Sequence, residues 1–142
     1  MQRIFLLIGI INQLATTRLN RVLGEIDLPM AQFSLLAHYS NNPERGWTVT
    51  ELARVMEVNQ PAMTKTTQRL LKKGYLKMVQ EKADKRVKSF YVTENGLKVL
   101  LSAWDKLGPD ITRIAQEWNS EDLKTLESLL ERLKTQLDEA RD

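Results

Sequence analysis

The sequence contains no cysteine, and this absence sets the first limits on its chemistry. Without a thiol there is no disulfide, no thiolate zinc site, no cysteine nucleophile and no thiol-based redox switch. A chain without cysteine is compatible with a reducing compartment, and we expect the protein to be cytoplasmic.

Histidine and the common catalytic motifs are also scarce. His38 is the single histidine, so a zinc site built from clustered histidines and carboxylates is not expected. The sequence has no recognisable pair of nucleophile and base and no glycine-rich phosphate loop. We therefore predict no metal, no cofactor and no enzymatic activity.

Long hydrophobic runs are missing. The most apolar stretch, FLLIGII at residues 5–11, is followed by polar residues within the next turns. It is far shorter than the roughly 20 residues that cross a bilayer, and no small-residue cleavage site follows it. These features predict a soluble protein without a membrane partner.

The charge is modest in total and uneven in distribution. The 142 residues carry a net charge of +3, with 42% hydrophobic and 27% charged residues, which is typical of one folded domain. Nine basic and two acidic residues lie between Lys65 and Lys88, whereas residues 117–142 carry a net charge of −4. A basic block within one folded segment favours a polyanionic partner.

Apolar residues at helical spacing predict a long amphipathic helix over residues 3–26, rich enough in apolar side chains to provide a partner surface. A shorter helix follows Pro29 and is expected to bury Phe33, Leu36 and Ala37, with Tyr39 or Ser40 at its margin. Residues 41–46 have the composition of a loop.

Two helices joined by a tight turn are predicted within residues 47–74. Thr48 and Glu51 have the spacing of a capping box, so a helix begins there. Asn59 is a favourable N-cap for the next helix, Pro61 falls in its first turn, and Gly74 is a typical residue after its end. This is the spacing of a helix-turn-helix, whose second helix enters the DNA major groove.

The second of these helices has two distinct sides. Its predicted inward side is Met63, Thr67, Leu70 and Leu71. The other side is rich in hydrogen-bond donors to bases and phosphates, and a solvated surface helix is the alternative interpretation. The predicted DNA-contacting residues are Gln60, Pro61, Ala62, Thr64, Lys65, Gln68 and Arg69.

A basic hairpin is predicted next, with strands over residues 75–80 and 87–92 and the polar loop EKADKR between them. A polar hairpin is weak evidence by itself. Directly after a helix-turn-helix it becomes a wing, which can place Lys85 or Arg86 in the narrow minor groove.

Three helical segments complete the chain. Thr93 can cap a helix that includes Leu97 and Trp104, and Gly108-Pro109 is expected to kink or break it. Residues 110–118 resume the helical pattern. A last helix starts at Ser120, with leucines repeating by threes and fours, and is expected to pack on the N-terminal helix of its own chain or of a partner.

The chain resembles the MarR-type (multiple antibiotic resistance regulator) winged helix-turn-helix transcription factors. The resemblance follows the element order along nearly the whole chain and is carried by TVTELARVMEVNQPAMT, RLLKKGYL, ADKRVK and VTENG. It implies a mostly α fold with a small β-hairpin wing. It also implies an organisation as a single domain over 1–142, with a winged helix-turn-helix lobe at 30–93 and dimerisation helices at 1–26 and 94–142.

The family pattern further implies roles for the wing and for an effector. The Asp-x-Arg of the family wing fits Asp84-Lys85-Arg86, so Arg86 would enter the minor groove while Asp84 holds the wing; Lys88 completes the predicted wing contacts. Family members often bind small aromatic anions in a crevice. Residues that would approach it are Arg18, Arg21, His38 and Trp104; core packing is the alternative for Trp104, and a satisfied or exposed side chain for His38.

The resulting hypothesis is a sequence-specific DNA-binding regulator, a homodimeric repressor of a pseudo-palindromic operator that a small ligand can release. Dimerisation is also expected from physical grounds, because one helix-turn-helix makes too few base contacts for operator-grade specificity. The alternative is a winged-helix module that binds another protein and has no specific DNA binding.

Overall fold

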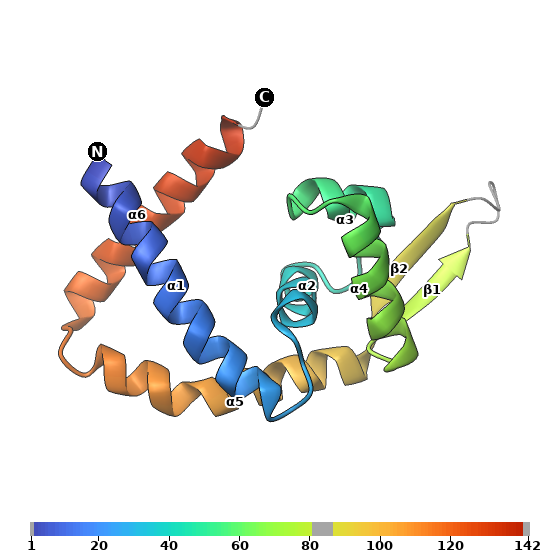
Figure 1. The fold of residues 1–142 in the computed structure, drawn as a ribbon, viewed down its shortest axis with the longest axis horizontal. Helices are drawn as coiled ribbons and strands as arrows, with labels where there is room; N and C mark the ends of the chain where they lie inside the picture. The colour runs from blue at the N-terminus through green and yellow to red at the C-terminus, as the bar shows by residue number, and fades with distance from the viewer. Residues whose placement is uncertain (1, 81–86, 141–142) are drawn as a thin grey trace. The chain divides into compact units, whose positions relative to one another are not determined.

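The computed structural model describes residues 2–80 and 87–140, which contain the helices and strands drawn in Figure 1. Their order is α1 (Gln2–Gly24), α2 (Met30–Ser40), α3 (Val49–Val55), α4 (Gln60–Lys72), β1 (Leu76–Gln80), β2 (Lys88–Val92), α5 (Glu94–Ala115) and α6 (Ser120–Glu139). The chain divides into two compact units, Met1–Leu107 and Gly108–Asp142. The predicted mostly helical fold with a β-hairpin is confirmed.

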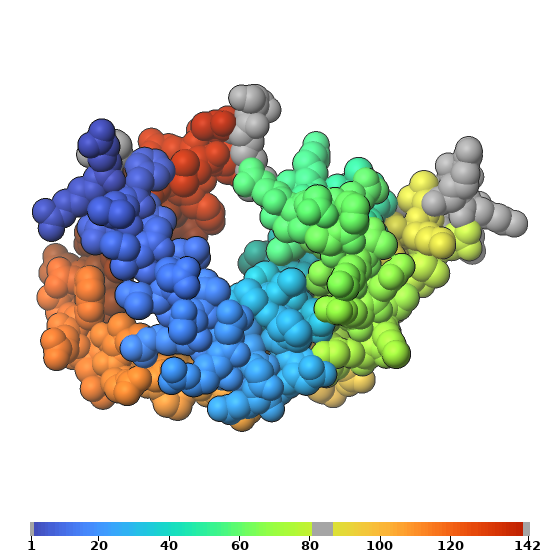
Figure 2. Space-filling model, in the orientation of Figure 1, coloured from blue at the N-terminus to red at the C-terminus, as the bar shows by residue number. Residues whose placement is uncertain are grey.

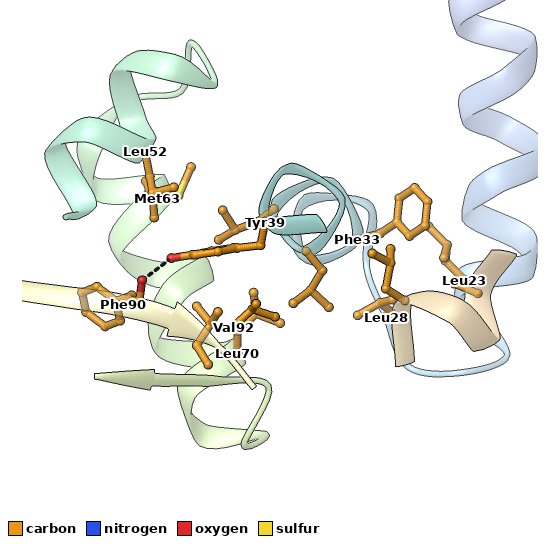
Figure 3. Close-up of a cluster of buried hydrophobic side chains, with 14 of the residues drawn as sticks. Leu23, Leu28, Phe33, Tyr39, Leu52, Met63, Leu70, Phe90 and Val92 are labelled. Carbon is orange, nitrogen blue, oxygen red and sulfur yellow. Dashed lines mark hydrogen bonds between the residues drawn. The ribbon is translucent and has the colours of Figure 1, made fainter. Parts of the chain in front are cut away.

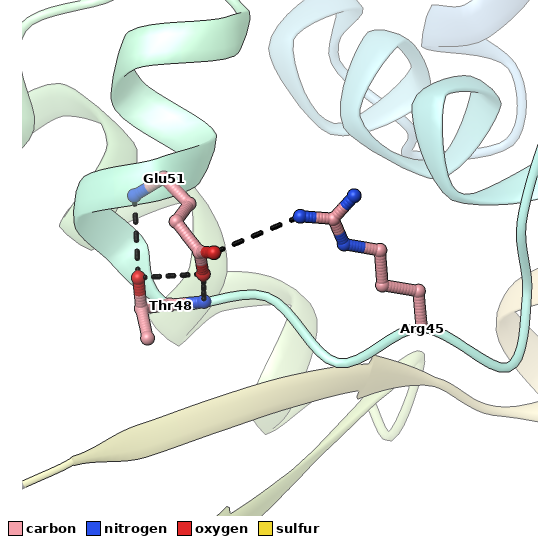
Figure 4. A network of polar contacts seen from close by, with 3 residues as sticks. All are labelled: Arg45, Thr48 and Glu51. Atoms are coloured by element: carbon pink, nitrogen blue, oxygen red, sulfur yellow. Dashed lines mark hydrogen bonds and ion pairs between the residues drawn. The ribbon is translucent and has the colours of Figure 1, made fainter.

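Local capping residues set the ends of α3 and α4 as the sequence predicts. The Thr48 hydroxyl accepts a hydrogen bond from the Glu51 N–H at 3.2 Å, and the Glu51 carboxylate accepts one from the Thr48 N–H at 2.8 Å (Figure 4). The Asn59 side chain accepts from the Ala62 N–H at 2.9 Å. Gly74 follows α4 with a φ of +72°, a conformation that favours glycine.

The core of the first unit surrounds α2. Leu35, Leu36 and Tyr39 of α2 are fully buried. They pack in one core with buried residues of α1, α3, α4, β2 and α5, several of which are labelled in Figure 3. The expectation that Tyr39 lies at the margin of the core is wrong. Its hydroxyl donates to the Phe90 carbonyl at 2.8 Å, and this bond allows a phenol to be buried completely.

The hairpin is antiparallel, with Leu76 opposite Val92 and Gln80 opposite Lys88. Trp47 extends it through an isolated bridge: the Trp47 N–H donates to the Phe90 carbonyl at 3.0 Å, and the Phe90 N–H donates to the Trp47 carbonyl at 2.8 Å. The segment that enters α3 is therefore fixed on the hairpin.

Helix α5 continues through Pro109, so of the predicted kink or break the break is wrong. Proline has a φ close to the helical value, and its missing N–H removes one helical hydrogen bond, to the carbonyl of Asp105. Asp105 is exposed. Water can satisfy the carbonyl on an exposed turn, which keeps the cost of the lost bond low enough for the helix to continue.

In the part of the chain that the structure describes, no helix is both long and apolar enough to cross a membrane. Within the same residues, no group of three or more histidine and carboxylate side chains is arranged to hold a metal ion.

A stack of cationic and aromatic side chains braces the entry to α3. The Arg45 guanidinium lies 3.6 Å from the centroid of the Trp47 ring, and the ring of His38 packs edge-on against Trp47 at 4.8 Å. Arg45 also approaches the Glu51 carboxylate at 3.7 Å. Burial, and secondarily the positive charge of Arg45, lower the pKa of His38 below its usual value of 6.5.

This environment predicts a pH-dependent stability. The unfolded chain protonates His38 at a higher pH than the folded chain does, so the free energy of unfolding should decrease as the pH falls below 6.5. The measurement is urea unfolding at about pH 7.5 and about pH 5.5. The matched control is His38→Phe, which keeps an aromatic ring on Trp47 and should lose less stability over this interval. An equal loss in both proteins would assign the effect to other groups.

Candidate nucleic-acid interface

Helix α4 is divided into a buried and an exposed side. Met63, Thr67 and Leu70 are buried in the core of the first unit. Leu71, predicted to face inward, is 36% exposed, because it lies beside the hairpin at the edge of the core. The predicted contact residues lie on the other side, where Ala62 and Thr64 are half-buried and the rest are exposed: Gln60, Pro61, Lys65, Gln68 and Arg69.

Hydrogen bonds fix the first turn of α4 against α3. The side-chain amide of Gln60 donates to the Thr50 hydroxyl at 3.1 Å, and the Thr64 hydroxyl donates to the Gln60 carbonyl at 2.9 Å. Thr50 was not among the predicted site residues. The sequence signal that could have identified Thr50 is its position two residues after the N-cap Thr48. This position lies at the start of α3, which adjoins the second helix in a helix-turn-helix.

A groove of about 590 Å³ lies between α4, the start of α3 and the hairpin. Thr64 and Gln68 of α4 line it together with Thr50 of α3 and Lys88 of β2. The structure therefore brings part of the predicted recognition face and one of the predicted wing residues, Lys88, to one groove. In the space-filling view, α3, α4 and the hairpin occupy adjacent parts of the surface of the first unit (Figure 2).

The structure describes one of the four predicted wing residues. Lys88 is exposed at the start of β2. Asp84, Lys85 and Arg86 lie outside the described residues. The described strands on either side of this segment are paired in register up to Gln80 and Lys88.

The four predicted effector-contacting residues have different surroundings in the structure. Arg18 and Arg21 are exposed on α1. Trp104 of α5 packs edge-on against Phe33 at a centroid distance of 5.2 Å, and His38 packs against Trp47. Trp104 is nevertheless 45% exposed and lies outside the core cluster, and His38 is half-buried. A shared ligand crevice remains a prediction.

Comparisons with known proteins agree with this geometry. A sequence model of the MarR family matches residues 26–87, a range that contains α2, α3, α4 and β1. The multiple antibiotic resistance protein MarR of Escherichia coli (strain K12) is 28% identical over 128 residues, covering 89% of this chain and 88% of that protein.

Solved structures share the fold. A crystal structure of a mutant MarR from E. coli complexed with operator DNA has a TM-score of 0.71 and 27% identity, covering 89% of this chain and 90% of that one. A MarR protein from Peptoclostridium difficile has a TM-score of 0.78 and 24% identity, covering 96% and 88% of the two chains, and supports the fold alone. The family-model match over residues 26–87, the relative along most of the chain and the common winged-helix fold show that this chain is similar to transcriptional regulators of the MarR family.

Proposed function

We propose that the protein is a homodimeric repressor that binds a pseudo-palindromic operator through α4 and the wing. The observation that carries this proposal is the exposed polar side of α4, held beside the hairpin by a buried side. Thr, Lys, Gln and Arg side chains on such a helix can reach base edges and phosphates. The operator-DNA complex of the E. coli relative supports the same use of the fold.

The proposed contacts divide by chemistry. Gln68 and Arg69 can make bidentate hydrogen bonds to adenine and guanine, whereas Lys65 provides a point charge for phosphate. The remaining α4 contacts are polar ones from Gln60 and Thr64 and apolar ones from Pro61 and Ala62. The proposed wing contacts are Asp84, Lys85, Arg86 and Lys88, with Arg86 in the minor groove.

Dimerisation is proposed from exposed apolar side chains that a monomer would leave in water. In α1, Leu7 is 46%, Ile11 61% and Leu14 61% exposed. In the second unit, Leu126 is 39% and Leu130 50% exposed. Large apolar surfaces of this kind mark partner interfaces. A second copy of the chain fits best, because two-fold pairing doubles the base contacts and fixes the spacing of the half-sites.

Release by a small aromatic or anionic ligand is the regulatory part of the proposal. Arg18 and Arg21 offer positive charge on α1, and His38 and Trp104 offer aromatic surface elsewhere in the first unit. Such a ligand would lower operator affinity only if it binds the DNA-free conformation more tightly than the DNA-bound one.

Gln68→Ala tests the proposed base readout. Gln68 is exposed and outside the core, so the variant should keep its fold and lose discrimination between operator and altered half-sites. The expected loss is about 1–3 kcal/mol of discrimination, the contribution of one bidentate base contact. Half-site variants would be compared in binding titrations at constant salt, with exposed Lys98→Gln on α5 as the control. Unchanged discrimination would remove Gln68 from the readout.

Arg86→Ala tests the proposed wing contact and DNA binding itself. We expect the variant to stay dimeric and to bind the operator more weakly than the wild type, because a cation is lost from the minor groove. Wild-type binding to random duplex should also fall steeply with salt. A filter-binding titration measures both. Wild-type affinity in the variant would contradict the wing role, and salt-independent binding would favour a protein-binding module.

Ile11→Glu tests the dimer interface. Ile11 is 61% exposed in the single chain, so a glutamate there should be tolerated by the monomer and should disfavour apolar pairing. Sedimentation should show dissociation, and operator affinity should fall with it. Gln13→Glu, which adds the same charge on the opposite side of α1, is the control. A dimer that is equally stable in both variants would place the interface elsewhere.

A further inference from the structure

A second cavity lies on the flank of α4, away from the groove beside the hairpin. It has a volume of about 350 Å³ and is lined by Asp27, Pro29, Gln32, Arg69, Lys72 and Lys73. All six residues belong to the first unit: Asp27 and Pro29 to the link between α1 and α2, Gln32 to the first turn of α2, and the basic residues to the end of α4.

The carboxylate in this cavity is already engaged. The Lys73 ammonium lies 3.0 Å from a carboxylate oxygen of Asp27 and also donates to the main-chain carbonyl of that residue. Asp27 has a φ of +49°, an uncommon conformation for a residue other than glycine, and these two contacts help to hold it. Among the residues that the structure describes, Arg69 and Lys72 have no carboxylate partner. Their two positive charges remain available to a ligand.

Gln32 gives an independent sign of a ligand. Its side chain is only 3% exposed, it lines the cavity, and its amide oxygen has no hydrogen-bond partner. A buried amide oxygen without a partner is uncommon in folded proteins. The oxygen and nitrogen of such an amide can exchange places by rotation, which allows it to donate to an anion.

The start of α2 adds a partial positive charge. The N-cap residue is Pro29, and no side chain caps the first turn. The N-terminal end of a helix attracts anions, and two residues of this end, Pro29 and Gln32, line the same cavity as Arg69 and Lys72. A helix end, two cations and a buried amide therefore converge on one space of ligand size.

We propose that this cavity binds a phosphate group, carried by a small phosphate monoester or by the DNA backbone. The three cations and one carboxylate of the lining leave a net charge of +2, which matches the roughly −1.5 to −2 of a phosphate monoester at neutral pH. Charge balance favours the small monoester, because a backbone phosphate carries a single charge.

Occupation of the cavity would regulate the proposed DNA binding through Arg69. This residue lines the cavity and is also one of the proposed DNA contacts, so a phosphate bound beside it would compete with the operator for its guanidinium. This consequence rests on the proposed function. Phosphate binding itself does not.

The test is a titration of the full chain with inorganic phosphate, monitored by NMR and by calorimetry. Chloride is used to keep the ionic strength constant. Saturable binding is expected, with shifts at the start of α2 and the end of α4. Lys72→Gln should weaken it about tenfold or more, the effect of losing one hydrogen bond to a charged group. Lys98→Gln removes the same charge from α5 and should bind like the wild type. Gln32→Leu, if it folds, should also bind more weakly.

A second arm identifies the source of the phosphate. If free phosphate binds, it should lower operator affinity of the wild type and have little effect on Lys72→Gln. If free phosphate does not bind, a backbone contact predicts that Lys72→Gln decreases the slope of log affinity against log salt by about 0.9, with no decrease in Lys98→Gln. Equal phosphate binding by all variants would overturn the proposal. So would a protein that does not bind free phosphate and whose salt slope is unchanged by Lys72→Gln. The first arm contains no DNA, so its failure is distinguishable from a failure to bind an operator.

Discussion

The carbonyl of Phe90 is the point on which the helix-turn-helix depends. It accepts hydrogen bonds from the buried Tyr39 hydroxyl at 2.8 Å and from the Trp47 N–H at 3.0 Å. One carbonyl with two acceptor positions thereby joins α2, the entry to α3 and the hairpin. Helix α4 buries Met63 and Leu70 in the same core. The hydrogen bonds to the Phe90 carbonyl and this packing together set the orientation of the exposed side of α4.

The two sides of α4 differ in their contacts. Its buried side belongs to a core that extends from α1 to α5, whereas its exposed side carries the donors that we propose for recognition, one of which, Gln60, also donates to Thr50 of α3. Arg69 lies where the exposed side adjoins the basic cavity near the start of α2. Under the two proposals above, this single side chain would take part in DNA contact and in binding of a small anion, so that one would influence the other without a large movement of the core.

Features that depend on neighbouring residues were predictable from the sequence. The capping box at Thr48, the N-cap at Asn59 and the end of α4 before Gly74 each involve residues close in sequence, and the structure confirms them. Predictions of burial at the edges of elements were less accurate. Leu71 is exposed because the hairpin leaves a groove beside it, and Tyr39 is buried because a distant carbonyl satisfies its hydroxyl.

The sequence by itself determined where α3 and α4 begin and where α4 ends, because these limits follow from hydrogen bonds between residues close in sequence. It also determined most of the buried side of α4, which follows from the helical repeat. Only the tertiary structure decided which distant groups meet: Gln60 with Thr50, Arg45 with Trp47, and Lys73 with Asp27. Lys73 and Asp27 are 46 residues apart, and their contact depends on how the core packs α4 against the link between α1 and α2. No local pattern contains that information, because packing, rather than propensity, brings the two segments together.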